Sequence, residues 1–178
     1  MQKLGHVFGS TFEYPMALFA GDLAAATAWD GNAPILEPKY KGFAAVKLEK
    51  LRAAVFDIGG LAHVALGFRD ADTLMFVEDT SEEPDVATAA FKRASALAGD
   101  PGALLTIATI DVPSGILVIG EAWKDYDGDP LEGGKAPAGA KARSLDDEAL
   151  VVSVTPGVYT IARRKIAEGT AGIVRIAR

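Results

Sequence analysis

The chain has 178 residues, 49% of them hydrophobic, which is enough for one domain with a sizeable core. Its formal net charge of −6 argues against a nucleic-acid binder, whose surface is usually basic. It contains no cysteine, which excludes disulfides and thiolate metal sites, and its longest apolar stretch is broken by Gly21-Asp22, so no run is long enough for a membrane helix.

Short apolar runs rich in Val, Ile and Phe dominate the chain, and they predict roughly ten short, mostly antiparallel strands. Glycine and proline separate many of these runs. Gly59-Gly60, Pro113-Ser114-Gly115 and Thr155-Pro156-Gly157 are each expected to form the turn of a β-hairpin. The predicted strands are Met16–Ala20, Phe43–Leu48, Ala53–Ile58, Ala62–Phe68, Leu74–Val77, Leu104–Ile110, Ile116–Glu121, Leu150–Val154, Val158–Arg163 and Gly172–Ile176.

One stretch, Ser81–Ala98, has the features of a long helix. Thr80 and Glu83 match a capping box, acidic residues occupy the first turn, and Gly99 follows the last apolar position. A second, shorter helix is expected over Asp22–Trp29, where alanine is frequent and alanine is the best helix former.

These elements predict an α+β or mainly β fold in which the helix over 81–98 packs on a sheet. The chain 1–178 is expected to form a single domain. A weak internal similarity is present, since Leu18-Phe-Ala-Gly-Asp22 resembles Leu117-Val-Ile-Gly-Glu121. It leaves open two loosely similar β-rich halves, about 1–99 and 100–178. The predicted core residues are Leu18, Val46, Val55, Phe56, Val64, Leu66, Phe76, Phe91, Leu97, Ile107, Leu117, Ile119, Val152, Val154, Tyr159, Ile161 and Ile173.

Acidic residues are concentrated in the middle of the chain. Residues 70–132 carry fourteen Asp and Glu against three Lys and Arg, whereas residues 1–69 have a net charge of +1 and residues 135–178 of +4. Two interpretations fit this distribution: a binding surface for a cationic partner, or the solvated acidic face of a globular domain.

The stretch Lys124–Arg143 is predicted to be a long loop, since it is rich in Gly and Pro and has few apolar residues. Its alternating acidic residues are close to the pattern of a calcium-binding loop. However, Pro130 occupies the position of the required glycine, and Ala136 that of the bidentate glutamate. We therefore expect no metal site here.

Aromatic residues beside the acidic ones make this loop a candidate protein-binding site. Trp123 precedes the loop and Tyr126 lies within it, and aromatic side chains often anchor protein–protein interfaces. The neighbouring carboxylates would supply charge complementary to a cationic protein partner. The predicted partner-binding residues are Trp123, Asp125, Tyr126, Asp127, Asp129 and Glu132.

A different candidate is a small-ligand pocket or enzyme site around His63 and Asp57. The two residues flank Gly59-Gly60, so a tight turn would bring the imidazole and the carboxylate together. Neither a G-x-S-x-G nucleophile motif nor a glycine-rich phosphate motif accompanies them. A structural histidine bonded to a neighbouring strand or to Asp57 explains the same pattern.

Several short motifs occur in a defined order along the chain. They are Met16–Ala20, Trp29-Asp-Gly31, Tyr40-Lys-Gly-Phe43, His63-Val-Ala-Leu66, Val154-Thr-Pro-Gly-Val-Tyr-Thr-Ile161 and Arg175–Arg178. This order resembles an immunity-protein family of bacterial polymorphic-toxin systems, the twenty-first in its naming series. The resemblance implies a protein that binds a cognate toxin and blocks it without catalysis, and it implies no catalytic residues.

The sequence thus favours a non-catalytic protein-binding domain that inhibits a basic toxin, without a cofactor and without a membrane or nucleic-acid partner. The alternative is a small ligand-binding domain or enzyme that uses His63 and Asp57. The start of the chain lacks the basic, apolar and cleavage regions of a signal peptide, which favours a cytoplasmic location.

Overall fold

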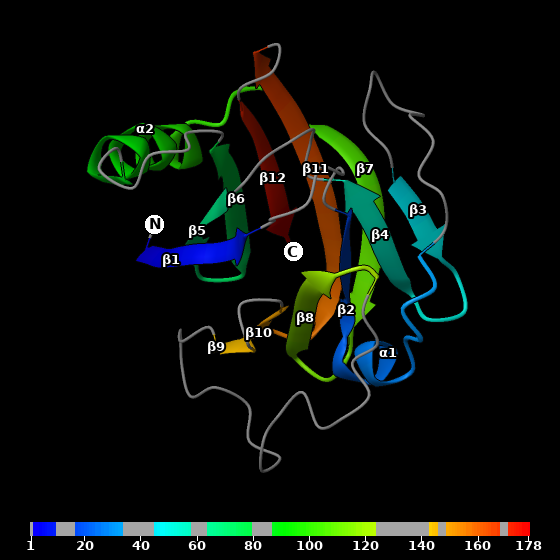
Figure 1. The fold of residues 1–178 in the computed structure, drawn as a ribbon. Coiled ribbons are helices and arrows are strands. Elements are labelled where there is room, and N and C mark those ends of the chain that lie inside the picture. Colours follow the sequence, from blue (N-terminus) through cyan, green and yellow to red (C-terminus); the bar gives the residue numbers. More distant parts are fainter. Residues whose placement is uncertain are drawn as a thin grey trace.

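The computed structural model describes residues 2–9, 17–33, 45–57, 64–79, 87–123, 143–145, 149–167 and 171–178. Within these ranges the chain forms twelve strands and two helices (Figure 1). The helices are α1 (Leu23–Thr27) and α2 (Ala87–Gly99). The strands are β1 (Gln2–Gly9), β2 (Ala17–Asp22), β3 (Ala45–Leu48), β4 (Ala53–Asp57), β5 (Val64–Asp70), β6 (Thr73–Asp79), β7 (Leu105–Val112), β8 (Ile116–Glu121), β9 (Arg143–Leu145), β10 (Ala149–Ser153), β11 (Gly157–Ala167) and β12 (Ala171–Ala177).

The strands form two six-stranded sheets in which every described pairing is antiparallel. Sheet A has the order β1-β5-β6-β12-β11-β7, and sheet B the order β3-β4-β2-β8-β10-β9. The largest core cluster takes Phe56 and Leu117 from sheet B and Phe76 and Tyr159 from sheet A. The two sheets therefore pack face to face around one shared core.

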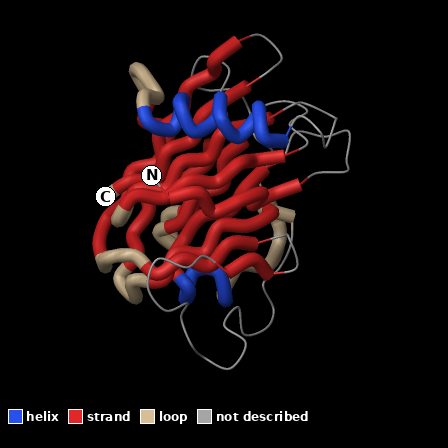
Figure 2. Tube along the Cα trace, turned by 90° about the vertical axis from the view of Figure 1, so that its left-hand side faces the viewer, coloured by secondary structure: helices blue, strands red, loops and turns tan. Residues whose placement is uncertain are grey.

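A helix covers part of the outer face of each sheet. On sheet B, α1 and the buried Trp29 lie over Phe19. On sheet A, the small side chains of Ala94 and Ala98 from α2 pack against Met75. Figure 2 shows the two helices on opposite sides of the strands. The molecule therefore has four layers, in the order helix, sheet, sheet, helix.

The short helix expected over 22–29 is confirmed as α1, and Asp22 explains where it begins. One carboxylate oxygen of Asp22 caps the helix by accepting a hydrogen bond from the backbone N–H of Ala24 at 3.0 Å. The other oxygen accepts hydrogen bonds from the backbone N–H and the hydroxyl of Ser114, at 2.9 and 2.5 Å. Asp22 thus also holds the turn between β7 and β8 against the start of the helix.

Each sheet combines three strands from either half of the chain in a matching arrangement. Read inward from its two edges, sheet A gives β1-β5-β6 and β7-β11-β12, and sheet B gives β3-β4-β2 and β9-β10-β8. In both sheets, adding six to each strand number of the first half gives the strand of the second half. The strand order therefore has pseudo-twofold symmetry, with its axis between β6 and β12 and between β2 and β8.

The pairing register follows the same symmetry. In the β2–β8 pair, the two similar segments lie opposite each other around Ala20 and Ile119. The first residue of each segment pairs with the last residue of the other, Leu18 with Glu121 and Leu117 with Asp22. Both edge strands of sheet A, β1 and β7, also carry a register shift at matching positions, beside Leu4 in β1 and beside Ile107 in β7. Strand order and this bulge therefore repeat in the two halves, whereas the second shift of β1, between His6 and Phe8, and the shift of β11 between Lys165 and Ala167 have no counterpart among the described pairings.

Most of the predicted core residues lie in the core. Val46, Leu97 and Val154 are only partly buried, and the side chains of Val64, Leu66 and Phe91 lie outside the described part of the structure. The predicted residues that the structure buries are Leu18, Val55, Phe56, Phe76, Ile107, Leu117, Ile119, Val152, Tyr159, Ile161 and Ile173.

The predicted α+β or mainly β fold, with roughly ten strands and one long helix over 81–98, is wrong as stated. The fold is mainly β, because twelve strands in two sheets carry it and the described helix α2, Ala87–Gly99, has 13 residues. Residues 81–86 lie outside the described ranges. The two strands that the prediction missed, β1 and β9, are sheet edges. The sequence of β1, QKLGHVFG, is interrupted by polar residues and glycine, and β9 has only three residues, so neither gives an apolar run; the other two edges, β3 and β7, were predicted.

The three predicted hairpins are also wrong. Pro113-Ser114-Gly115 joins β7 of sheet A to β8 of sheet B, and Thr155-Pro156-Gly157 joins β10 of sheet B to β11 of sheet A. The chain between β4 and β5, which contains Gly59-Gly60, likewise joins sheet B to sheet A. Turn residues mark where a strand ends, but they do not determine whether the next strand pairs with it or crosses to the other sheet.

The inner core makes one clear prediction for stability. Phe76 is 0% exposed and lies on β6 beside the pseudo-twofold axis, so Phe76→Ala should lower the free energy of unfolding by about 3–5 kcal/mol. Val158→Ala, at a side chain that is 59% exposed, is the control and should change it by less than about 0.5 kcal/mol. Urea unfolding measures both values. A loss below about 1 kcal/mol for Phe76→Ala would contradict the packing of the two sheets.

Candidate functional site

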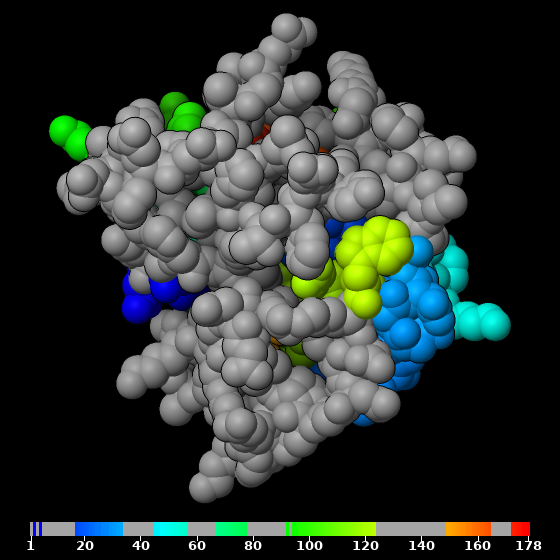
Figure 3. All heavy atoms as spheres, viewed as in Figure 1, coloured from blue at the N-terminus to red at the C-terminus, as the bar shows by residue number. Residues whose placement is uncertain are grey.

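Trp123 is a large exposed apolar side chain held on a fixed backbone. It lies two residues after the end of β8, and 55% of its surface is exposed. The preceding residue, Ala122, is buried, donates its N–H to the carbonyl of Ala17 at 2.9 Å and accepts a hydrogen bond from the indole N–H of Trp29 at 3.1 Å. In Figure 3 the yellow-green end of the β8 segment protrudes beside the light-blue atoms that follow β2. The site therefore presents an aromatic ring without needing a flexible segment to place it.

The other tryptophan has the opposite environment. Trp29 is only 6% exposed and stacks on Phe19, with 5.3 Å between the ring centroids. Asp30, which follows it, is exposed and accepts hydrogen bonds from the backbone and side-chain N–H groups of Asn32, at 3.1 and 2.9 Å. The side-chain hydrogen bond from Asn32, with that from its backbone, lowers the pKa of Asp30 below its usual value. Trp29 therefore belongs to the core, while the adjacent carboxylate stays ionised at the surface.

Most of the other predicted site residues lie outside the described part of the chain. This holds for Asp125, Tyr126, Asp127, Asp129 and Glu132, and for His63 of the alternative site. Asp57 is the last residue of β4 and its backbone lies opposite Ala17, but its side chain is not among those described. Of the predicted partner-binding residues, the structure therefore places Trp123 alone.

The described residues contain no group of three or more His, Asp or Glu side chains placed to hold a metal ion. The hydroxyl of Ser114 lies at 2.5 Å from a carboxylate oxygen of Asp22 and accepts a hydrogen bond from the N–H of Ile116 at 3.1 Å. This serine–carboxylate contact fixes a turn and a helix cap.

A buried arginine that the sequence analysis missed connects the two sheets. Arg69 of β5 is 7% exposed and donates to the carbonyl of Ala71 at 3.0 Å and to the carbonyl of Ser153, on β10 of the other sheet. Its remaining terminal nitrogen, Nη1, is buried without a hydrogen-bond partner. Arg163 of β11, which is 2% exposed, occupies the symmetry-related position. A lone arginine in an apolar strand gives no sequence signal for this role.

Polar groups beside Arg69 form hydrogen bonds with one another. Thr155 donates its backbone N–H to the carboxylate of Asp72 at 2.8 Å, and Tyr159 donates its hydroxyl to the carbonyl of Thr155 at 2.6 Å. The side-chain hydrogen bond from Thr155 is the main cause that lowers the pKa of Asp72. This cluster locks the β5–β6 turn to the β10–β11 turn, and its role is structural.

Neither a protein-family model nor a curated protein nor a solved structure matches this chain. Among the described residues, no helix has the length and apolar character that spanning a membrane requires. The function is therefore inferred from the geometry of the site and from the sequence around it.

The tyrosine in the polar cluster makes stability depend on alkaline pH. Burial, together with the charge of Asp72, raises the pKa of Tyr159 from 10.0 to about 12. Since the folded protein holds this proton more tightly than the unfolded chain, its contribution is complete below pH 10 and is lost as the pH rises towards 12. Urea unfolding at several pH values should show this loss in the native chain. Tyr159→Phe should remove it, and an unchanged pH dependence in that variant would contradict the assignment.

Proposed function

We propose that this protein is a non-catalytic protein-binding domain whose interface is centred on Trp123. The observation that carries the proposal is the exposed indole on a backbone fixed by Ala122. A rigid aromatic side chain gives an interface a large contact area at a low cost in conformational entropy. Isolated exposed apolar residues are common on protein surfaces, but an exposed tryptophan at a hydrogen-bonded strand end fits an anchor.

The charge of the sequence supports a cationic partner. Trp123 is followed along the chain by Asp125, Asp127, Asp129 and Glu132, within a region in which acidic residues outnumber basic ones fourteen to three. Such a region would attract a basic protein and accelerate the encounter between the two. The proposed partner is therefore a basic protein, with the indole as the apolar centre of the contact and the carboxylates around it.

The resemblance to the immunity-protein family adds a biological role to this proposal. We propose that the chain acts in the bacterial cytoplasm, where it binds a basic toxin and blocks it. The gene neighbourhood is a direct check, because a toxin with a cationic C-terminal domain should be encoded next to this gene. If no relative has such a neighbour, the inhibitor role loses its main support, whereas binding to another basic protein would remain open to the test below.

Substitution of the tryptophan tests the interface. Trp123→Ala should weaken binding of the neighbouring toxin domain by about 2 kcal/mol or more, roughly thirtyfold, because an interface anchor would be lost. Its melting temperature should stay unchanged, since the side chain is exposed. Isothermal titration calorimetry measures the affinity, with Val158→Ala as the matched control at another exposed apolar residue. Equal affinities for Trp123→Ala and the native chain would show that the interface lies elsewhere.

The acidic residues make a separate prediction about rates. Asp127→Asn should slow association with the basic partner, and added salt should slow association of the native chain, because both weaken long-range attraction. Dissociation should change little. Stopped-flow mixing at low and high ionic strength measures both rates. An association rate independent of salt would exclude a cationic partner at this site.

A further inference from the structure

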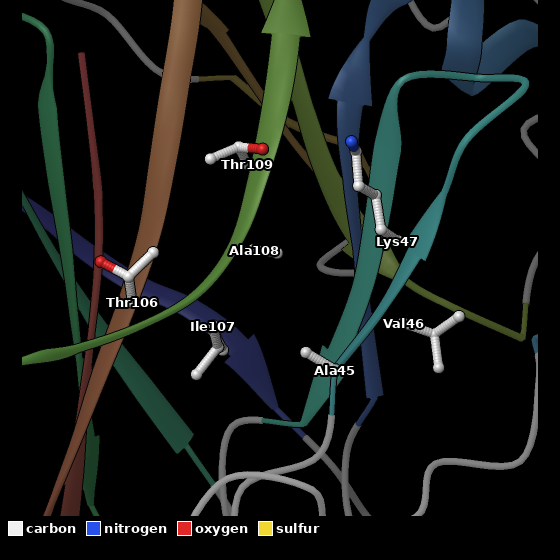
Figure 4. A pocket seen from close by; sticks show the side chains of 7 residues that line it. All are labelled: Ala45, Val46, Lys47, Thr106, Ile107, Ala108 and Thr109. Atoms are coloured by element: carbon white, nitrogen blue, oxygen red, sulfur yellow. The ribbon is translucent and has the colours of Figure 1, made fainter.

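A groove separates the edge of one sheet from the edge of the other, away from the sites already described. Its volume is about 510 Å³, and it is lined by three residues of β3 and four of β7. Figure 4 shows the residues that line it. They are Ala45, Val46, Lys47, Thr106, Ile107, Ala108 and Thr109.

Both walls of the groove are open β-sheet edges. In the described structure β7 pairs only with β11, and β3 pairs only with β4. Along such an edge, the backbone N–H and C=O groups on the outer side are available to another strand. The register shift beside Ile107 disturbs the ladder between β7 and β11 at the middle of the groove. Bulges of this kind are common at sheet edges and beside binding sites.

Side chains along the groove leave room for a polypeptide backbone. Ala45 from β3 and Ala108 from β7 project into the space between the two strands (Figure 4). Beyond the groove, the guanidinium of Arg52 lies at 2.7 Å from the carboxylate of Asp111, and the N–H of Asp111 donates to the carbonyl of Arg52 at 3.0 Å. These contacts join the β3–β4 turn to β7, so the two edges keep their spacing.

We propose that this groove binds an extended acidic segment of a partner protein, which adds as a strand to the free edge of β7. Strand addition supplies affinity through main-chain hydrogen bonds and specificity through alternate side chains. The charge of the groove selects the segment: Lys47 is the only charged residue among the seven that line it. Its partner Glu49 lies at 3.2 Å, and both side chains are exposed, so this ion pair is weak and a bound carboxylate can replace Glu49.

Peptide selection tests the proposal without a known partner. The probe is a phage-displayed library of random linear peptides, selected on the native chain and counter-selected on the folded Ala108→Phe chain, in which the groove is filled. We expect enriched peptides with an Asp or Glu at a fixed position. We also expect their binding to protect the amides of Thr106–Thr109 from hydrogen exchange.

Two measurements distinguish strand addition from side-chain binding and from loss of folding. In a set of peptides that each carry one N-methylated amide, methylation at every second residue should abolish binding, because alternate N–H groups face β7. Lys47→Glu should weaken the binding of an acidic peptide by about tenfold or more. Lys50→Glu is the matched control, since Lys50 is exposed, lies three residues along the chain and does not line the groove. Lys50→Glu and Trp123→Ala should both leave the affinity unchanged.

Several results would overturn the proposal. These are the absence of enriched peptides, equal binding by the Ala108→Phe chain, and loss of binding without a two-residue period in the N-methylated peptides. Equal effects of Lys47→Glu and Lys50→Glu would exclude the acidic segment. Protection of Thr106–Thr109 that grows with protein concentration and without peptide would identify a second copy of the chain as the occupant instead.

Discussion

The two strand pairs at which the halves of the chain meet, β2–β8 and β6–β12, are the constraint on which the rest of the structure depends. Each is the central pair of its sheet, so each half supplies only three strands to a sheet of six. The shared core crosses this boundary, because Phe76 of β6 lies opposite Val174 of β12 and both belong to it. Neither half closes a core of this kind alone, and folding must therefore bring together strands far apart in the sequence.

Both sheets are covered on both faces, so few side chains of the central strands are exposed for binding. All six residues of β2 are buried, and four of the five residues of β10 are buried. Where the chain must place polar groups inside, as at Arg69, their hydrogen bonds serve to join the sheets. Binding surfaces are consequently expected at strand ends and at sheet edges. Trp123 follows a strand end, and the β3–β7 groove lies between two edges.

The sequence was informative about strands and turns but not about how the strands are arranged. Central strands such as β8 combine Val, Ile and Leu without interruption, because both faces are buried, and such runs are easy to recognise. β1 and β9 contain no such run and were missed, whereas the edge strands β3 and β7 were recognised. The connections at Gly115 and Gly157 cross between sheets, and a turn motif carries no information about that choice. Pairing between distant strands is decided by the core as a whole.

The two tryptophans show why sequence alone could nominate the candidate site but not establish it. Trp29 and Trp123 each follow a similar strand, Leu18-Phe-Ala-Gly-Asp22 and Leu117-Val-Ile-Gly-Glu121, although Trp29 lies seven residues after its strand and Trp123 only two. After β2 the chain forms α1, and Trp29, which follows this helix, stacks on Phe19. The same ring donates to the carbonyl of Ala122, so the buried tryptophan fixes the backbone that holds the exposed one.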